Sequence, residues 1–202
     1  YYLQMLRNIR AFKYTEAREY AMPQTDMSRA DAWDSVRTYP DFAGDAMERN
    51  FRAYHGSLPN YVDTTNRNDI VGVQVAHDGD SLYFRVETLE DITPYQEGDQ
   101  GWMNIRIATS RTEGYDFVIN HTYGKLSAIE DGAYRVVGDA EIEVDGRFMT
   151  VRIPLSLIGQ RGTPAIRFQV SDNVDASDVM NFYIQGDSAP IGRLSYTYGY
   201  QK

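Results

Sequence analysis

Two short segments of this chain alternate apolar residues with side chains that could recognise a polar ligand. In "LYFRVET", Tyr83 and Glu87 alternate with apolar residues, and in "WMNIRIA" so do Trp102, Asn104 and Arg106. Because successive side chains of a strand point to opposite faces, both sets are expected on the face away from the core. Aromatic rings beside amide, guanidinium and carboxylate groups suit a sugar, whose C–H face stacks on a ring while its hydroxyl groups need directed hydrogen bonds.

The segment "YDFVIN" adds Asp116 and Asn120 to the same predicted face. We therefore expect one carbohydrate-binding patch, in which Trp102 and Tyr83 provide stacking. The hydrogen-bonding members of this patch are Asn104, Arg106, Glu87, Asp116 and Asn120. The alternative is that residues 41–67 fold over this face and bury Trp102, since tryptophan is highly buried on average.

Tyrosine is abundant, with 16 copies in 202 residues. Four of these tyrosines lie in predicted loops, where a rigid ring with a polar tip makes a good contact surface for polar ligands: Tyr54, Tyr61, Tyr95 and Tyr123. Each of them alone fits ordinary packing equally well. Together they favour a recognition surface.

Hydrolysis of a glycosidic bond is a second chemistry that the acidic residues could perform, because it needs a pair of carboxyl groups. Asp116, Glu87 and Asp172 are candidates, but no motif selects a pair among the 29 acidic residues. We therefore assign no catalytic residue and keep a hydrolytic unit as the alternative. A haem site would need Met103 and His121 as axial ligands.

A hard cation is the third option. The turn "SDNVDASD" places Asp172, Asp175 and Asp178 close together in sequence, and calcium prefers such oxygen ligands. The alternative is an Asx-rich turn that only caps backbone groups. No cofactor is required by these patterns, Ca²⁺ is the metal that fits this turn, and the three separated histidines give no zinc motif.

The elements that must position these residues are strands. Asp78-Gly79 and Asp145-Gly146 mark the turns of two hairpins, over residues 69–88 and 140–154. Further strands are predicted at 102–108, 115–120, 165–172, 179–184 and 193–200. This pattern predicts an all-β fold, an antiparallel β-sandwich of jelly-roll or immunoglobulin-like type with one N-terminal helix.

Residues 1–25 carry apolar side chains at helical spacing, which predicts an amphipathic helix that is left from or links to a preceding domain. Residues 26–202 form the β-sandwich domain. The net charge of −9 argues against a nucleic-acid partner, and no apolar run reaches the roughly 20 residues of a membrane span. Disulfides and thiol chemistry are excluded because cysteine is absent.

Several segments resemble a known family. "NDIVGVQVAHDGDSLYFRVETLEDITP", "WMNIRI", "EGYDFVIN", "VRIPLSLIG", "FQVSDN" and "DVMNFYIQGDSAPIGRLSY" are similar to family 9-like carbohydrate-binding modules of the DOMON-type β-sandwich group. In particular they resemble the versions at the C-terminal end of secreted Bacteroidetes glycoside-hydrolase-like proteins. The most specific pieces are "EGYDFVIN" and the closing segment from "DVMNFY" to "GRLSY".

The resemblance implies a non-catalytic module that binds a poly- or oligosaccharide and follows a glycoside-hydrolase-like domain in a secreted, periplasmic or cell-surface protein. It leaves open an architectural sandwich that only packs on that domain. Family 9 modules hold sugar between two tryptophans, whereas this chain has only Trp33 and Trp102, in unrelated segments. The loop 109–114 is also shorter and less acidic than in relatives, so contacts made by that loop are not carried over.

Overall fold

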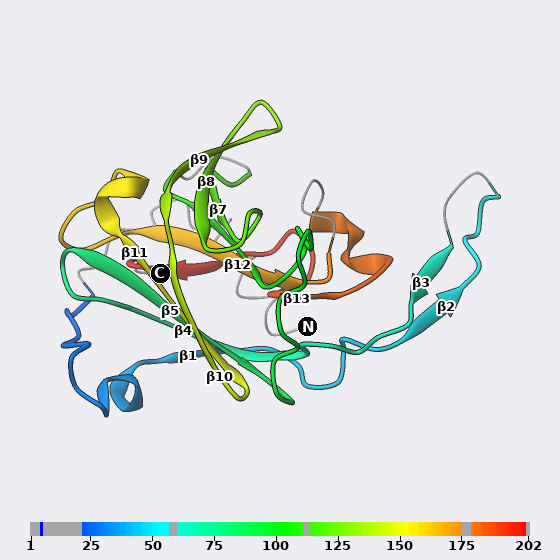
Figure 1. The fold of residues 1–202 in the computed structure, drawn as a ribbon, viewed down its shortest axis with the longest axis horizontal. Coiled ribbons are helices and arrows are strands. Elements are labelled where there is room, and N and C mark those ends of the chain that lie inside the picture. The colour runs from blue at the N-terminus through cyan, green and yellow to red at the C-terminus, as the bar shows by residue number, and fades with distance from the viewer. Residues whose placement is uncertain (1–4, 6–21, 57–59, 111–113, 175–178, 201–202) are drawn as a thin grey trace.

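The computed structural model describes Met5 and residues 22–56, 60–110, 114–174 and 179–200 (Figure 1). The helix predicted over residues 1–25 therefore falls almost wholly outside the described residues. Within it, residues 22–25 are not helical. Met22 packs against the core and Thr25 N–H donates to the carbonyl of His77 at 2.8 Å, so the chain joins the folded body at this point.

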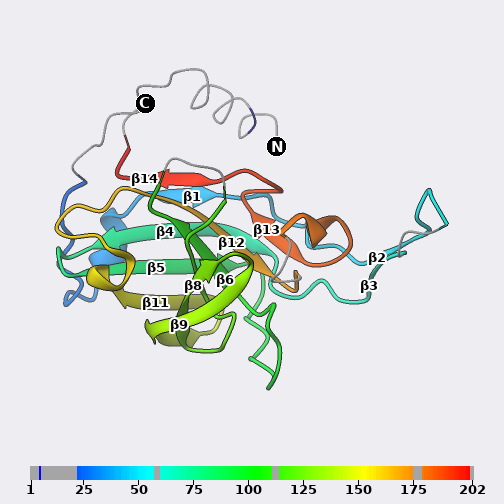
Figure 2. The ribbon, with the colours of Figure 1, turned by 90° about the horizontal axis from the view of Figure 1, so that it is seen from above.

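The first sheet has five antiparallel strands. In spatial order they are β1 (Thr38–Pro40), β4 (Ile70–His77), β5 (Ser81–Thr88), β11 (Phe148–Pro154) and β10 (Glu141–Asp145). Figure 2 shows β1, β4, β5 and β11 side by side. Both predicted hairpins are confirmed, because His77 pairs with Leu82 and Asp145 pairs with Phe148 across the two Asp-Gly turns.

The second sheet has seven strands and is also antiparallel. Its path is β13 (Asp187–Ala189), β12 (Ile166–Asp172), β6 (Asn104–Ala108), β7 (Phe117–Ile119), β8 (Lys125–Glu130) and β9 (Ala133–Asp139), with β14 (Tyr196–Tyr198) pairing on β12. Strands at 102–108, 115–120, 165–172 and 193–200 are thus confirmed, with shorter bounds. The hairpin of β8 and β9 was not predicted.

The core lies between the two sheets, in a sandwich-like arrangement. Phe84 of the first sheet and Phe168 of the second meet edge to face, with ring centroids 5.6 Å apart. One buried cluster includes apolar residues of β4, β5 and β11 together with those of β6, β12 and β14. The prediction of an all-β antiparallel fold is therefore confirmed for the described residues.

Three short 3₁₀ helices and one small hairpin complete the described chain. The helices are η1 (Ala32–Ser35), η2 (Leu155–Ile158) and η3 (Val179–Tyr183), and the hairpin is β2 (Arg49–Phe51) with β3 (Tyr61–Asp63). The predicted strand at 179–184 is wrong, because η3 occupies most of it. In the described ranges, no helix has the length and apolar character that a membrane crossing requires.

The segment 41–67 does not fold over Trp102, which was the alternative considered for it, because the loop around Thr93 covers that indole. Its hairpin of β2 and β3 projects away from the two sheets, as Figure 1 shows. The segment contacts the body before the hairpin, where the Asp41 N–H donates to the carbonyl of Val71 at 3.0 Å. It also does so at the base of the hairpin, where Arg49 donates to the carbonyl of Gly186 at 2.7 Å and Asp63 accepts from the Gly186 N–H at 2.7 Å.

Candidate functional site

The predicted carbohydrate patch is divided between the two sheets. Tyr83 and Glu87 lie on β5, which pairs with β4 and β11 in the first sheet. Asn104 and Arg106 lie on β6, which pairs with β12 and β7 in the second. Since the two sheets bury their inner faces against each other, their outer faces point in opposite directions. The expectation of a single patch is therefore wrong.

On the first sheet, the predicted residues bind their own neighbours. The Tyr83 hydroxyl donates to a carboxylate oxygen of Asp78 at 2.6 Å. Glu87 forms an ion pair with Arg147 on the neighbouring strand region. Both side chains are half-buried, and their contacts are those of an ordinary solvated sheet face.

On the second sheet, the predicted hydrogen-bonding residues are buried, which contradicts the expectation that they face solvent. Arg106 donates to the Ser171 hydroxyl at 2.7 Å, and the Asn120 amide donates to the carbonyl of Met103 at 3.1 Å. Asn104 is fully buried, with its amide 3.3 Å from the carbonyl of Trp102. These side chains hold the backbone of the sheet and its loops, so they do not form a ligand surface.

The C-terminal segment contributes to this burial. The Gln169 amide on β12 donates to the carbonyls of Pro190, at 2.9 Å, and Gly192, at 2.5 Å. The Tyr115 hydroxyl lies 3.0 Å from that of Ser195. Residues 190–195 therefore lie over the outer side of β12 and close it to solvent.

Asp116 closes the 109–116 turn. One of its carboxylate oxygens accepts hydrogen bonds from the backbone N–H groups of Thr109, at 2.7 Å, and Ser110, at 3.3 Å. A half-buried carboxylate with these partners stabilises a turn, which is a common role of aspartate.

Trp102 is buried, with only 1% of its surface exposed, so its predicted outward orientation is wrong. Its indole N–H donates to the carbonyl of Thr93 at 2.7 Å. The physical reason is local: Met103 has φ +42°, so the alternation of β6 begins at Asn104 and does not extend back to Trp102. The loop around Thr93 covers the indole, and the segment 41–67 proposed for that role projects elsewhere.

Two tyrosines from the predicted loops pack on this indole. The rings of Tyr95 and Tyr123 stack with centroids 4.3 Å apart and planes 20° apart. Tyr95 meets Trp102 edge to face at 5.9 Å, and Tyr123 lies 5.5 Å from it. Tyr123 remains 43% exposed and Tyr95 is half-buried. We refer to this stacked pair, of which Tyr123 is the exposed member, as the Tyr95–Tyr123 platform.

Trp33 does not join the platform. It lies in η1, and the guanidinium of Arg85 on the first sheet is 5.9 Å from its ring centroid. The two tryptophans of the chain are thus parts of different regions, and they do not form a clamp.

Asp172, the described member of the predicted calcium turn, already has partners on both carboxylate oxygens. One accepts from the Met103 N–H and the other from Arg67 Nε, both at 2.9 Å. Burial raises the pKa of Asp172 to about 6, against the opposing effect of Arg67. Asp175 and Asp178 lie outside the described residues. Calcium binding at this turn stays a prediction.

Among the described residues, no site is assembled for glycoside hydrolysis or for haem binding. The three candidate carboxylates have different partners in separate places. Asp116 accepts from the backbone N–H of Thr109, Glu87 pairs with Arg147, and Asp172 pairs with Arg67. The Met103 side chain is in the core, and the His121 ring stacks on Tyr134 with centroids 3.7 Å apart. A hollow of about 560 Å³ lies along residues 22–37 beside Val75 and Tyr198, and none of the predicted site residues lines it.

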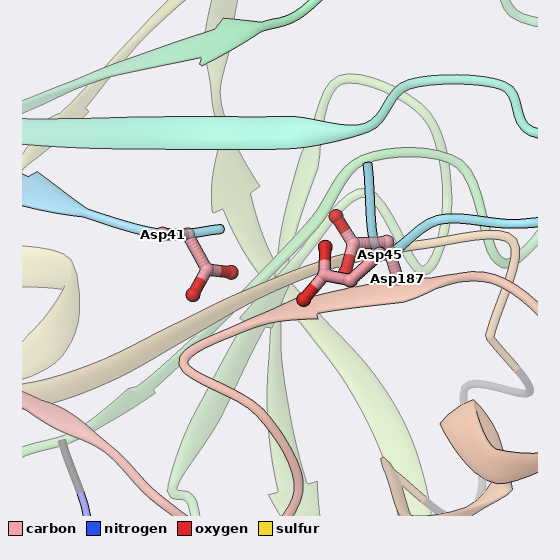
Figure 3. A group of neighbouring side chains, drawn as sticks. All are labelled: Asp41, Asp45 and Asp187. Atoms are coloured by element: carbon pink, nitrogen blue, oxygen red, sulfur yellow. The ribbon is translucent and has the colours of Figure 1, made fainter. Parts of the chain in front are cut away.

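A cluster of carboxyl groups that the sequence did not predict lies at one end of the sheets. Figure 3 shows Asp41 just after β1, Asp45 in the loop before β2 and Asp187 at the start of β13. Their nearest oxygens all lie within 4.8 Å of one another. The only sequence signal was the presence of acidic residues in loops, which this chain shows at many other positions.

The protonation of this cluster is strongly perturbed. Burial, reinforced by the charges of Asp187 and Asp45, raises the pKa of Asp41 to about 9. Burial and the charge of Asp45 raise the pKa of Asp187 to about 8. The pKa of Asp45 is also raised, by burial and then by the charge of Asp69. Such groups either hold protons or share a cation.

No family model matches this chain, and no curated protein was found to be similar to it.

Proposed function

We propose that this chain is a non-catalytic carbohydrate-binding β-sandwich module that binds a poly- or oligosaccharide at the Tyr95–Tyr123 platform. The observation that carries the proposal is the exposure of Tyr123 in a three-ring cluster whose other members are held in place. Trp102 then supports the binding surface from below and does not touch the ligand.

The platform has the properties that sugar stacking needs. Tyr123 leaves 43% of its surface open to solvent, and Tyr95 fixes the ring from one side. The Tyr95 hydroxyl accepts a hydrogen bond from the Gly98 N–H at 3.1 Å, which restrains the loop that carries it. A ring restrained before binding loses little conformational entropy when a sugar stacks on it.

Polar groups for the sugar hydroxyls lie next to Tyr123 in the chain. Thr122 is exposed, and Lys125 forms an exposed ion pair with Asp139. These groups take the part that the sequence assigned to Asn104, Arg106 and Asn120. The family resemblance supports the further part of the proposal, a role in a secreted, periplasmic or cell-surface protein that processes polysaccharide.

Calorimetric titration with a panel of soluble oligosaccharides tests the proposal, with Tyr123→Ala as the decisive variant. We expect its affinity to fall by about tenfold or more, equivalent to about 1.4 kcal/mol, while the thermal midpoint changes little. Tyr54→Ala is the matched control, because Tyr54 is fully exposed on the projecting hairpin and should leave affinity unchanged. Binding that survives Tyr123→Ala, or no binding by the wild type to any glycan, would refute the proposed site.

An architectural role is the second candidate, and the projecting hairpin favours it. Five of the large exposed apolar residues lie in this hairpin or beside it: Phe42, Met47, Phe51, Tyr54 and Val62. A run of apolar side chains on a projecting element is typical of a contact surface. In this role the hairpin packs against the neighbouring glycoside-hydrolase-like domain that the family resemblance implies.

Hydrogen exchange separates the two roles. If the hairpin packs on a neighbouring domain, the amides of residues 49–56 exchange more slowly in a longer protein containing that domain than in this chain alone. Equal exchange rates in both proteins would exclude the packing role for this hairpin. The result has no bearing on glycan affinity at the platform, so each role can fail separately.

A further inference from the structure

The ring of Tyr95 is carried by the loop of residues 93–101, and this loop is held at its first residue. The Thr93 N–H donates to Oδ1 of Asn68 at 2.7 Å, and the Thr93 carbonyl accepts from the Trp102 indole at 2.7 Å. Asn68 is 4% exposed, so its contact with the loop is sheltered from water. The position of the chain before Tyr95 is therefore fixed through both backbone groups of one residue.

The other end of this loop is held by the residue next to Asn68 in the chain. Nη2 of Arg67 lies 2.7 Å from Oδ2 of Asp99 in an ion pair. Asp99 Oδ1 accepts from the Gly101 N–H at 3.0 Å, and the Gly101 carbonyl accepts from the Asn173 N–H at 2.9 Å. Arg67 and Asn68 thus fasten both ends of the loop between them.

Arg67 also reaches a second carboxylate, which lies inside the second sheet. Its Nε is 2.9 Å from Oδ2 of Asp172, whose side chain is fully buried, and Asp172 Oδ1 accepts from the Met103 N–H at 2.9 Å. We refer to Asp99, Arg67 and Asp172 as the Arg67 bridge. The side chains of Arg67 and Asp99 are only 17% and 21% exposed, so water screens the bridge less than a surface ion pair. Because a guanidinium presents its donors in a fixed fork, it sets the position of one carboxylate relative to the other.

The same stretch of backbone holds the loop that carries Tyr123. The Met103 carbonyl accepts from the Asn120 amide at 3.1 Å, and Asn120 Oδ1 accepts from the Gly124 N–H at 3.1 Å. Asn120 and Gly124 flank Tyr123 in the sequence. A continuous path of hydrogen bonds and ion pairs therefore connects the two loops that form the platform, and the Arg67 bridge lies in the middle of this path.

We propose that Arg67 is a positioning residue for glycan binding at the Tyr95–Tyr123 platform, because its bridge holds the loop of Tyr95 in the place where the two rings stack. This inference rests on the proposed sugar site. Arg67 acts through the loop and does not contact the sugar. If the bridge is broken, the loop samples other positions, and the apparent affinity falls in proportion to the fraction of molecules with both rings in place.

Asp99→Asn is the first variant, because it breaks one contact of the bridge and leaves Arg67 paired with the buried Asp172. The asparagine keeps an oxygen for the Gly101 N–H, whereas its amide nitrogen replaces the oxygen that met the guanidinium. Calorimetric titration with a glycan that the wild type binds should show an affinity lower by about three- to tenfold. The variant should remain folded, which far-ultraviolet circular dichroism checks at the temperature of the titration.

Arg67→Lys tests the same contact from the other side. The lysine keeps a positive charge beside Asp172 but lacks the fork that reaches two carboxylates at once. We expect a loss of affinity similar to that of Asp99→Asn. The double variant should lose no more than either single variant, because both changes break one contact. Losses that come only from a general weakening of the fold would instead add up in the double variant.

The aromatic rings report the position of the loop without any sugar. Near-ultraviolet circular dichroism depends on rings held in fixed surroundings, so its signal should be smaller in Asp99→Asn than in the wild type. Arg152→Lys is the matched control, since Arg152 forms an exposed ion pair with Glu141 on the first sheet. This variant should keep both the spectrum and the affinity of the wild type.

The outcomes separate this inference from the proposed function. If Tyr123→Ala abolishes glycan binding while Asp99→Asn and Arg67→Lys bind as the wild type does, the sugar site stands and the positioning role is overturned. Additive losses in the double variant, or an unchanged near-ultraviolet spectrum in Asp99→Asn, would also overturn it. If the wild type binds no glycan, the proposed function itself fails, and the positioning role fails with it.

Discussion

The outer faces of the two sheets carry similar polar residues, but these residues are partly exposed on the first sheet and buried on the second. On the first sheet, Tyr83 and Glu87 are half-buried and bind charged neighbours at the surface. On the second sheet, Arg106 and Gln169 are buried and hold other parts of the chain in place. We refer to these surfaces as the open face and the covered face. The covered face lies beneath the segment 190–195. On the first sheet, η1 lies against β4, where Gln74 donates to the carbonyls of Trp33 and Val36 at 3.1 and 2.8 Å, but Tyr83 and Glu87 stay partly exposed.

This difference shows that residue type alone does not identify a binding surface. A polar side chain that is exposed exchanges water for a partner at little net gain, whereas a buried one must be paired to avoid a desolvation cost. Residues of the covered face should therefore be sensitive to substitution for reasons of stability. Residues of the open face should tolerate it.

The largest effect is expected at Trp102, at the edge of the covered face. Trp102→Ala removes a large buried ring and the hydrogen bond to Thr93, leaving a cavity. We expect a loss of about 3–5 kcal/mol in the free energy of unfolding, measured by urea denaturation. Trp33→Ala is the control, because Trp33 is only half-buried and should cost much less. Equal losses in the two variants would mean that Trp102 is not a core residue.

A smaller loss is expected at Gln169. Gln169→Leu keeps the volume of the side chain but leaves the carbonyls of Pro190 and Gly192 without their donor. We expect about 2–3 kcal/mol of destabilisation, together with faster hydrogen exchange across residues 191–196. A stable variant with unchanged exchange would show that the segment covers the sheet without help from this amide.

Much of the fold could be predicted from the sequence because its signals are local. The Asp-Gly turns at 78–79 and 145–146 and the alternation of Leu82, Phe84 and Val86 determine two hairpins and one core face. A turn type and a period of two depend only on neighbouring residues. Both hairpins could therefore be predicted without information about which distant strand each one pairs with.

The candidate site could not be predicted to the same extent. Strand β6 pairs with β12 and not with β5, a choice between distant segments that alternation does not encode. The positive φ of Met103 moves Trp102 off the expected face. The carboxylates at Asp41 and Asp187 come together only through the pairing of whole sheets. The sequence pointed to Tyr95 and Tyr123 as loop residues of a recognition surface, but it did not predict that they pack on Trp102.

A buried histidine on the first sheet tests whether burial, and not the sheet on which a polar residue lies, decides how strongly that residue affects stability. His77 on β4 is fully buried, and its Nδ1 lies 2.7 Å from the Tyr198 hydroxyl. Burial lowers the pKa of His77 below the usual 6.5. The unfolded chain therefore binds the proton more readily, and stability is lost as the pH falls through and below about 6.5.

Urea denaturation at pH 7.5 and at pH 5.5 measures this loss, in the wild type and in His77→Gln. We expect the decrease in unfolding free energy between the two pH values to be smaller in the variant, because one buried titrating group is gone. The pKa of His121 is also lowered by burial, and this residue is present in both proteins, so it cancels in the difference. A decrease of the same size in both proteins would show that the pKa of His77 is the same in the folded and the unfolded chain.

The smallest effect is expected on the open face itself, at the ion pair between Glu87 and Arg147. Both side chains are partly exposed, at 28% and 48%, so water screens their attraction. Glu87→Gln should change the free energy of unfolding by at most about 1 kcal/mol and leave glycan affinity unaltered. The same pair of measurements sharpens the comparison of the two faces, because Glu87 was predicted to bind sugar. If Glu87→Gln weakens glycan binding as strongly as Tyr123→Ala does, the ligand contacts the first sheet and the open face is the binding surface after all.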